Sequence, residues 1–533
     1  MHTLSATLTI ASAARLLDEH HLLREIIHDG RWTLDAEQVP GAHEAIPAIT
    51  YDTRTVTPGS LLFVKGRFRD EFLDGIDGRG LAAYVAEADH SDRTRAVGLI
   101  VDDAHQAMSL LSAEFYGRPQ DRLTVVGITG TKGKTTTAYL AHAILNDYSD
   151  GHAALFSSEQ TCLDGHTYVQ SKLTTPESLD AFRMMRQAVD QGMRYLVMEV
   201  SSQAYKVHRV HGLTFDVGAF LNISPDHISP IEHPTFEDYF RCKRQIVRNS
   251  RTLVLGADCA HRGLIEQDAA AAGVDVSLFD FRPDGAADAD GTGAAAAGDR
   301  RALVETRIDP GNPAGFRMAV DGRDLGSFEL TMPGAFNIVN AAAAVAIAVR
   351  AGVPADDPAV RAIERVQVPG RMERIVGGDN LLVYVDFAHN YLSCKTLVDE
   401  IVRVYGARNP RITLVAGSTG GKAIDRREGI VRGALGRAES FYFTLDDPNF
   451  EDPREIAEQM RSYVTDPNAE THVIVPRERA IEAAIADARA HADRFNIVLL
   501  IGKGHELRNI IDGRPVPYEG DAVIARRALG VAG

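Results

Sequence analysis

Short apolar runs alternate with longer amphipathic stretches along most of the chain, and this alternation predicts an α/β protein. The runs TVVGI (124–128), YLVMEV (195–200), DVGAFLNI (216–223) and TLVLGA (252–257) are each too short to form an independent helix. Such runs, placed between helical stretches, are typical of strands that are buried on both faces of a parallel sheet. We therefore expect a mostly parallel sheet in the middle of the chain.

Turn residues divide this pattern into three parts. GRPQDR places a Gly-Pro break before the strand at 124, and VPGRMERI places another break near residue 370. We predict three α/β domains, at residues 1–120, 121–369 and 370–533, of which the last is Rossmann-like. Residues 282–301 are rich in Ala, Gly and Asp, and we expect them to form a mobile surface loop.

Composition and charge narrow the class of protein further. The 533 residues are 45% hydrophobic and 24% charged, as in an ordinary globular protein with several domains. A formal net charge of −16 disfavours broad nucleic-acid binding, because that function needs a basic surface to displace counterions from phosphates. A phosphate ligand must then be bound locally, by loops, helix N-termini and a few cations.

The sequence also predicts where the protein works. The first residues, MHTLSATLTIASAARLLDEHHLL, predict an amphipathic helix, since no basic segment precedes a clean apolar one as in a signal peptide. No apolar run approaches the length that spans a bilayer. The cysteines lack the spacing of a zinc site or a disulfide framework, and we expect reduced thiols at Cys162, Cys242, Cys259 and Cys394. A cytoplasmic protein is expected.

One segment predicts phosphate binding. VVGITGTKGKTTTAYLAHAIL reads as a strand, a Gly-rich loop and a helix, an order in which backbone N–H groups at a helix N-terminus surround phosphate. Ile128 stands where the usual loop pattern has its first glycine. Lys134 would reach the terminal phosphates, and Thr135 would offer its hydroxyl to Mg²⁺. The loop consists of Gly130, Thr131, Lys132, Gly133, Lys134, Thr135 and Thr136.

Seven motifs in order give a family resemblance: TGTKGKTTT, MEVSSQAYKVHRV, LNISPDHIS, GAFNIVNAAAA, VPGRMERI, VDFAHN and GKGHE. With them the chain resembles the Mur ligases, in particular their tripeptide synthetases, and YDTRTVTPGSLLFVKG extends the likeness to the N-terminal domain. The resemblance implies a UDP-binding first domain, a P-loop ATPase in the centre and an amino-acid-binding last domain. It also implies ATP-dependent ligation, in which a carboxylate becomes an acyl phosphate that an amine then captures as an amide.

The resemblance assigns catalytic and metal-binding roles. Glu199 and His227, which each follow an apolar strand, are implied to be ligands of Mg²⁺, and two such ions are expected. Lys243 aligns with a lysine that family members carry as a carbamate, an anion that supports the second ion. Taken without the resemblance, Lys243 would be a surface lysine beside Arg241 and Arg244.

Nucleotide contacts follow in the same way. The resemblance places Asn337 near the adenine, Arg371 near the ribose and phosphates, and Asp386 on the ribose. The third domain would then close on ATP bound to the second and exclude water from the acyl phosphate. Alone, these three residues could equally be a helix cap, a surface ion pair and a turn residue.

The implied acceptor substrate is a UDP-muramyl dipeptide. Thr174, Thr175, Ser201 and Arg209 match positions that hold it, although loop capping would explain the hydroxyls without the family. The N-terminal domain would bind the uridine diphosphate, and Thr53 replaces the serine of the common D-S-R pattern there.

The amino-acid pocket departs from one subgroup of the family. Synthetases that add diaminopimelate carry D-N-P-R, whereas this chain has Asp446, Asp447, Pro448 and Asn449 in that place. Without the arginine, and with the extra carboxylate of Asp447, a side-chain ammonium is favoured, so we expect L-lysine as the substrate. An acidic turn before a helix, with Asp446 as its cap, is the alternative. Further pocket residues implied by the resemblance are Lys422, Gly502 and Glu506.

Several alternatives stay open at this point. L-Ornithine could replace lysine, because one methylene changes binding by only ~1–3 kcal/mol, and meso-diaminopimelate is a further alternative. A folylpolyglutamate-synthetase-like ligase would share the loop and the mechanism, and a non-catalytic nucleotide-binding regulator would share the loop alone. The expected partners are UDP-N-acetylmuramoyl dipeptide and a free amino acid, with no nucleic acid, and we expect a monomer.

Overall fold

The computed structural model describes residues 8–226, 228–229, 232–282, 301–309, 312–421 and 423–531. The chain divides into two compact units, Met1–Lys134 with Ile144–Leu278 and Ala346–Pro354, and Thr135–Ala143 with Phe279–Val345 and Ala355–Gly533. Three domains with boundaries at 120 and 369 stay a prediction. The loop predicted at 282–301 lies outside the described residues except for its two ends. Within the described ranges, no helix is both long and apolar enough to span a membrane.

A six-stranded sheet with the order β2-β1-β6-β5-β4-β3 forms the N-terminal part of the first unit. Alternate residues of β4 face opposite sides: Leu61 and Phe63 pack against α1 and α2, while Leu62 packs against Leu73 and Ile76 in the 3₁₀ turns. The elements are α1 (Ile10–Glu19), β1 (Leu23–His28), β2 (Arg31–Thr33), β3 (Ile49–Thr50), β4 (Leu61–Phe63), β5 (Ala83–Ala86), β6 (Val97–Val101) and α2 (Ala104–Phe115), with 3₁₀ turns at Ala36–Gln38, Thr53–Thr55, Asp70–Leu73 and Ile76–Arg79.

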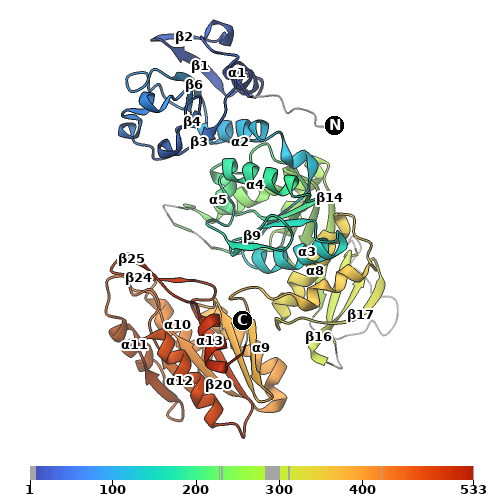
Figure 1. Ribbon diagram of the computed structural model, residues 1–533. Helices are drawn as coiled ribbons and strands as arrows, with labels where there is room; N and C mark the ends of the chain where they lie inside the picture. The colour runs from blue at the N-terminus through green and yellow to red at the C-terminus, as the bar shows by residue number, and fades with distance from the viewer. Residues whose placement is uncertain are drawn as a thin grey trace. The chain divides into compact units, whose positions relative to one another are not determined.

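The rest of the first unit contains the predicted parallel sheet, with the strand order β8-β11-β7-β12-β13. Ile128 of β7 lies opposite both Glu199 of β11 and Ala219 of β12, so these three strands end at one edge. Loops that follow parallel strands at such an edge are where α/β folds bind ligands. The elements, some of them labelled in Figure 1, are β7 (Thr124–Thr129), α3 (Lys134–Tyr148), β8 (Ala153–Phe156), β9 (Gln160–Cys162), β10 (Tyr168–Gln170), α4 (Ser178–Asp190), β11 (Tyr195–Glu199), α5 (Ser202–Lys206), β12 (Phe215–Phe220), α6 (Phe236–Arg248), β13 (Ser250–Gly256) and α7 (Arg262–Ala272).

An antiparallel ladder and a long helix precede the C-terminal part of the chain. β15 pairs with β16 and β16 with β17, all antiparallel, and β14 joins β15 in parallel. The alanine-rich stretch NIVNAAAAVAIAVR lies in a helix, and its alanines from Ala341 to Ala348 are buried. These elements are β14 (Asp275–Arg282), β15 (Val304–Asp309), β16 (Asn312–Val320), β17 (Arg323–Glu329) and α8 (Ala335–Arg350).

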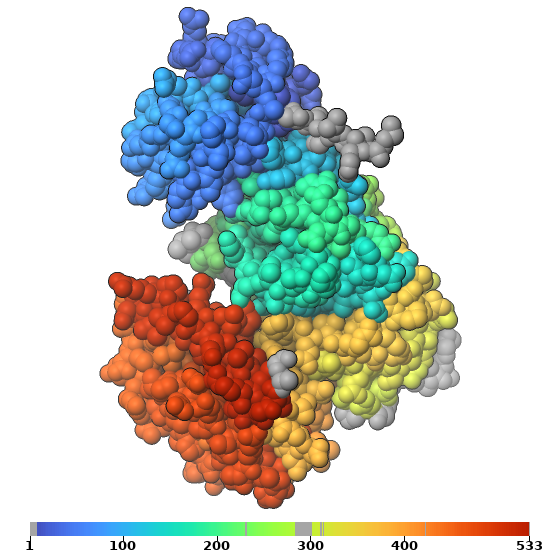
Figure 2. Space-filling model, viewed as in Figure 1, coloured from blue at the N-terminus to red at the C-terminus, as the bar shows by residue number. Residues whose placement is uncertain are grey.

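The second unit has its own six-stranded sheet, with the order β18-β19-β23-β20-β21-β22. All of its pairs are parallel except β18 with β19, and α12 and α13 lie side by side over it (Figure 1). A hairpin, β24 with β25, lies at the surface (Figure 2). The elements are β18 (Glu373–Gly378), β19 (Leu381–Asp386), α9 (Tyr391–Tyr405), β20 (Arg411–Ala416), α10 (Asp425–Ala434), β21 (Ser440–Phe443), α11 (Pro453–Ser462), β22 (Glu470–Val473), α12 (Arg477–Ala490), β23 (Asn496–Ile501), β24 (Arg508–Ile511), β25 (Arg514–Pro517) and α13 (Asp521–Leu529).

One buried ion pair joins the first residues of α12 and α13. Arg477 donates to both carboxylate oxygens of Asp521, at 2.8 and 2.6 Å, and their side chains are 1% and 0% exposed. We expect Asp521→Asn to lower the free energy of unfolding by about 3–5 kcal/mol, because it leaves a buried guanidinium without its counter-charge. Denaturant titration measures this loss. Arg527→Ala, which breaks a surface pair with Glu519, is the control and should keep the parent's midpoint. An unchanged midpoint in Asp521→Asn would contradict the prediction.

Candidate active site

The predicted phosphate loop connects β7 to α3. Gly130 and Gly133 have φ of 154° and 85°, values that L side chains rarely adopt, so the loop needs glycine at both positions. Lys134 is the first residue of α3, and its ammonium donates to the carbonyl oxygens of Gly130 (2.9 Å) and Thr131 (3.3 Å). The positive charge of Lys134 therefore lies against the backbone of the loop. Thr135 and Thr136, the next residues of the helix, are buried.

Residues that follow β12 hold this loop in place. The backbone N–H of Thr131 donates to the carbonyl of Asn222 (3.1 Å), and its hydroxyl is 3.1 Å from the carbonyl of Ser224. The N–H of Lys132 donates to Asn222 Oδ1 (3.0 Å), and its ammonium lies 3.2 Å from Asp226. Asn222 and Ser224 were not predicted as site residues, although LNISPDHIS contains both. Loops from two neighbouring strands thus form one structure.

Lys243 is buried beneath the phosphate loop, with a relative exposure of 1%. Its ammonium donates to the carbonyl of Gly130 (2.8 Å) and lies 4.9 Å from the ring centroid of Tyr239. Burial, and next the charge of Lys134, lower the pKa of Lys243 well below that of an ordinary lysine. The interpretation of Lys243 as a surface residue, made from its charged neighbours alone, is wrong. It belongs to the buried face of α6, which consists of Tyr239, Phe240, Cys242, Lys243, Ile246 and Val247.

Glu199 ends β11 at the same edge of the sheet, as predicted. It is 1% exposed, and its Oε1 accepts from the backbone N–H (2.8 Å) and the hydroxyl (3.1 Å) of Ser158. The charges of Glu199 and Asp226 both act on Lys243, since each opposes the fall of its pKa. The carboxylates of Glu199 and Asp226 and the ammonium groups of Lys132, Lys134 and Lys243 therefore meet around the phosphate loop.

These residues fit the groups that the family resemblance implies. Glu199 and Thr135 offer oxygen atoms, the ligands that Mg²⁺ prefers. The buried amine of Lys243, with its lowered pKa, is suited to react with CO₂, which requires the neutral form. Carbamate formation would turn that cation into an anion, and the cluster would then need a metal cation to balance its charge. His227, the other predicted metal ligand, lies outside the described residues.

The predicted dipeptide-binding residues lie next to Glu199. Thr175 is 1% exposed, and its hydroxyl donates to the carbonyl of Glu199 (2.9 Å) and accepts from the N–H of Ser201 (3.0 Å). Ser201 is the N-cap of α5, where its side chain accepts from the N–H of Ala204. Thr174, the preceding residue, is partly exposed. Thr175 therefore fixes the backbone between β11 and α5.

Arg209 is held by a carboxylate that was not predicted as a site residue. Two of its nitrogens lie 3.0 and 2.7 Å from Glu177 Oε1, and Lys65 lies 3.0 Å from Oε2. Although burial favours the neutral acid, the charges of Arg209 and Lys65 lower the pKa of Glu177. Two cations around one carboxylate leave a net positive charge, which suits an anionic substrate. Thr53, the predicted uridine-diphosphate residue, is the first residue of a 3₁₀ turn capped by Asp52.

The three predicted nucleotide contacts lie in the second unit. Asn337 is buried, and its amide donates to the carbonyls of Met332 and Pro333, at 3.3 and 3.2 Å. Asp386, at the end of β19, accepts from the N–H groups of Met372 and Ala388, both at 2.8 Å. Burial raises the pKa of Asp386. Arg371, in the turn before β18, stacks on the ring of Phe387 at 4.9 Å.

The predicted amino-acid pocket gathers three carboxyl groups around one buried lysine. Lys503, 0% exposed, lies 2.9 Å from Asp447, 2.8 Å from Glu506 and 3.7 Å from Asp446. Although burial disfavours its charge, Asp446 and Glu506 raise the pKa of Lys503, and burial raises the pKa of Asp446. Lys503 lies in the motif GKGHE, and no role was predicted for it. Three carboxyl groups for one ammonium leave negative charge for a second cation.

Two further residues shape this pocket. Asn449 has φ of 52°, and its amide donates to the carbonyl of Gly420 (2.8 Å). A side chain at Gly502 would begin 2.8 Å from Asp446 Oδ2, so glycine is required there. The alternative that Asp446 caps the next helix is wrong, because α11 begins after Asp452 as its N-cap. Lys422 lies outside the described residues.

Comparison with known proteins shows which family this chain resembles along its length. A family model described as Mur ligase middle domain matches residues 128–348, and one described as Mur ligase, glutamate ligase domain matches residues 370–504. The chain is 56% identical over 527 residues to UDP-N-acetylmuramyl-tripeptide synthetase of Bifidobacterium longum, covering 98% of this chain and 100% of that one. It is 39% identical over 524 residues to UDP-N-acetylmuramoyl-L-alanyl-D-glutamate–L-lysine ligase of Streptococcus pneumoniae serotype 2, covering 98% and 99%.

A solved structure supports the fold. The structure of UDP-N-acetylmuramoyl-L-alanyl-D-glutamate–2,6-diaminopimelate ligase is similar with a TM-score of 0.66 and 20% identity, covering 98% of this chain and 99% of that one. The phosphate loop, the buried lysine and the matched models together define an ATP-dependent ligase that forms amide bonds. The chain belongs to the Mur ligase family.

Proposed function

We propose that this ligase adds L-lysine to the D-glutamate carboxylate of UDP-N-acetylmuramoyl-L-alanyl-D-glutamate, with conversion of ATP to ADP and phosphate, in peptidoglycan synthesis. The observation that carries the proposal is the surplus of carboxyl groups around Lys503, which favours an amino acid with an extra ammonium group. The names of relatives that match along nearly the whole chain support the same reaction.

The residues of the chain have separate tasks in this reaction. The N–H groups of the phosphate loop and Lys134 hold the triphosphate of ATP, and Lys134 offsets the charge on the phosphoryl group as it is transferred. Arg209 and Lys65, with their net positive charge, hold an anionic part of the dipeptide substrate. Thr135, Glu199, His227 and carboxylated Lys243 would hold Mg²⁺, which would offset negative charge on the triphosphate and on the attacking carboxylate.

The second unit supplies the remaining contacts. We propose that Asn337, Arg371 and Asp386 bind the nucleoside part of ATP, and that Glu506 meets the amino group of the incoming amino acid. Asp447 then faces the side-chain ammonium. Each carboxyl oxygen of Asp386 accepts one backbone N–H group, from Met372 and from Ala388, at 2.8 Å, and these two hydrogen bonds fix the orientation of the side chain. We also propose the domain boundaries at 120 and 369, a cytoplasmic location and a monomer.

A panel assay tests the substrate. L-Lysine, L-ornithine and meso-diaminopimelate are each offered with UDP-N-acetylmuramoyl dipeptide and ATP, and phosphate release is measured. We expect L-lysine to give the highest kcat/KM and diaminopimelate the lowest, because its second carboxylate meets the negative charge of Asp446, Asp447 and Glu506. Preferred use of diaminopimelate would overturn the proposal.

A double substitution tests the charge argument within the pocket. Asp447→Asn with Asn449→Arg is expected to lower kcat/KM for lysine by about tenfold to a hundredfold, the loss of one charge-assisted hydrogen bond. The double substitution replaces the carboxylate of Asp447 by a neutral amide and adds the positive charge of an arginine, and both changes disfavour a side-chain ammonium. The control is Asp493→Asn, which removes an exposed carboxylate of the same unit. An unchanged preference in the same amino-acid panel would count against the charge argument.

Two other functions make different predictions. A folylpolyglutamate-synthetase-like ligase would use a pterin substrate, and a non-catalytic regulator would bind ATP without turnover. Exchange of label between ADP and ATP that depends on UDP-N-acetylmuramoyl dipeptide is expected only of the proposed ligase. The buried Lys243 on the loop carbonyl of Gly130 favours catalysis, because a binding protein has no need of a buried amine there.

A further inference from the structure

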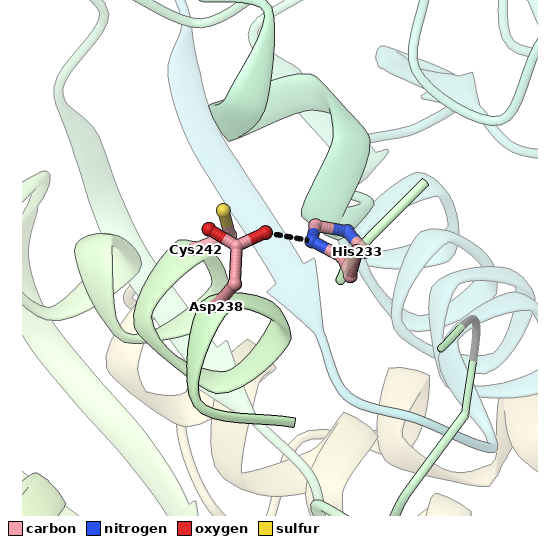
Figure 3. A group of neighbouring side chains, drawn as sticks. All are labelled: His233, Asp238 and Cys242. Carbon is pink, nitrogen blue, oxygen red and sulfur yellow. Dashed lines mark hydrogen bonds and ion pairs between the residues drawn. The ribbon is translucent and has the colours of Figure 1, made fainter. Parts of the chain in front are cut away.

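A chain of hydrogen bonds connects the helices that follow β11 and β12, and Figure 3 shows its link between His233 and Asp238. His233 is 1% exposed, its Nδ1 lies 2.8 Å from Asp238 Oδ2, and its Nε2 lies 2.9 Å from the hydroxyl of Ser202. A carboxylate only accepts hydrogen bonds, so Nδ1 carries a proton and donates it to Asp238. In the neutral ring, Nε2 then accepts from Ser202. The ring thus joins the first residue of α5 to the first turn of α6.

Asp238 is the centre of this arrangement. It is the third residue of α6, where its N–H donates to the N-cap Thr235, and a carboxylate in this first turn is favoured by the helix dipole. Asp238 Oδ2 lies 3.1 Å from the ammonium of Lys206, which ends α5. The pKa of Asp238 falls to about 2, chiefly through the hydrogen bond from His233. Both ends of α5 are therefore bound to one carboxylate, the first through His233 and the second through Lys206.

The same ring reaches the phosphate loop. His233 packs edge-on against Tyr239, with ring centroids 5.3 Å apart. The hydroxyl of Tyr239 lies 3.1 Å from that of Thr131, and its ring lies beneath the ammonium of Lys243. On the other side, Ser202 follows Ser201, whose N–H is bound by Thr175 next to Glu199. His233 therefore touches groups that fix both the dipeptide residues and the phosphate loop.

Cys242 completes a group whose ligand atoms are close enough to suggest a metal site, but the geometry favours a hydrogen-bond relay. The 2.8 Å between His233 Nδ1 and Asp238 Oδ2 is a hydrogen-bond distance. Asp238 is also paired with two cations, Lys206 and Arg241. A carboxylate that is already shared by two cations is a poor ligand for a third.

We propose that His233 is a positioning residue, because its ring connects Ser202 to Asp238. This connection fixes the distance between Ser201 at the start of α5 and Lys243 in α6 during ligation. The inference rests on the proposed function for its kinetic consequence alone. Its structural part, the connection between α5 and α6, stands on the hydrogen bonds of the chain itself.

Kinetics of the full-length enzyme test the role in ligation. We expect His233→Ala to lower kcat/KM for UDP-N-acetylmuramoyl dipeptide by about tenfold to a hundredfold, as for a small misplacement of reacting groups, while KM for ATP changes less than about twofold. Ser202→Ala should also lower kcat/KM for UDP-N-acetylmuramoyl dipeptide. The double variant should be no worse than His233→Ala, because both changes break one connection. His233→Asn, which can still donate to Asp238, should recover part of the loss.

A matched control separates positioning from a general effect on α6. Arg241 also donates to Asp238, at 2.9 Å, but its side chain is 76% exposed and lies outside the relay. Arg241→Ala is expected to keep the parent's kcat/KM. If His233→Ala and Ser202→Ala both behave as Arg241→Ala does, or if their effects simply add, the proposal is overturned. Should His233→Ala lose its fold, Ser202→Ala tests the same connection by removing one hydroxyl.

Hydrogen exchange tests the connection without any substrate. In the full-length protein, the amides of residues 201–206 are expected to exchange at least about fivefold faster in His233→Ala than in the parent, since α5 loses the tie at its first turn. Arg241→Ala should exchange like the parent. This measurement stands even if the parent enzyme fails to use the dipeptide substrate, which would overturn the proposed function alone. Equal exchange in His233→Ala and the parent would overturn the proposed connection between α5 and α6 through His233.

Discussion

Replacing Lys134 by alanine is expected to lower kcat by about a thousandfold or more, the size of effect seen when a cation that stabilises a transferred phosphoryl group is removed. The ammonium of Lys134 lies against the phosphate loop, where it donates to the carbonyls of Gly130 and Thr131. Its removal leaves the loop's N–H groups in place, so ATP should still bind, although more weakly. Phosphate release measures the rate, and nucleotide titration measures the remaining affinity.

The control for this prediction is a surface lysine that forms an ion pair within its own helix. Lys395 of α9 forms an ion pair with Asp399, one turn further along. Lys395→Ala is expected to keep the parent's rate, since surface pairs of this kind contribute little. A Lys134→Ala enzyme that folds and retains the parent's kcat would refute the role of this lysine, and with it the assignment of the loop.

Replacing Lys243 by alanine is the change with the second-largest expected effect, a loss of kcat of about a hundredfold or more, because it would remove the anionic metal ligand that we propose, a carbamate of Lys243. Such a carbamate would form when the neutral amine adds to CO₂ and releases one proton. Lys243→Arg keeps a positive charge near Gly130 but cannot be carboxylated, so it should be inactive as well. Full activity of Lys243→Arg would contradict a role as a carbamate.

A second measurement does not depend on activity. Protein prepared with ¹³C-labelled bicarbonate should show one labelled carbamate signal that is lost in Lys243→Arg and kept in Lys134→Ala. The parent enzyme should also lose activity when CO₂ is stripped from the buffer and regain it when bicarbonate returns. An enzyme with no such signal, and with no dependence on CO₂, would exclude carboxylation of Lys243.

The sequence predicted those parts of the fold that depend on local pattern. The apolar run at 195–200, predicted as a strand, forms β11, because the spacing of apolar residues over a few positions decides such an element. The position of Glu199 at a strand end followed directly. Two neighbouring arginines, however, suggested that Lys243 is exposed. Its spacing of four from Tyr239 and three from Ile246 places it on the buried face, and this periodicity was the signal to use.

The contacts that complete the site could not be predicted, because they join distant segments. Glu177 binds Lys65, 112 positions earlier, and Lys503 binds Asp447, 56 positions earlier. No local sequence pattern indicates that such distant residues form an ion pair. The role of Asn222 could not be predicted for the same reason. The pairing of β7 with β12 brings Asn222 beside the phosphate loop, where it accepts a hydrogen bond from Lys132. Only the tertiary structure supplies these distances.

The single lysine at the centre of the amino-acid pocket has a consequence for how such enzymes diverge. Lys503 is shared among Asp446, Asp447 and Glu506, so a change at any one acid alters the charge felt by the other two. Under the proposed function, a change of amino-acid substrate is therefore expected to need substitutions at more than one of these acids, because replacing one alters the electrostatic potential at the other two.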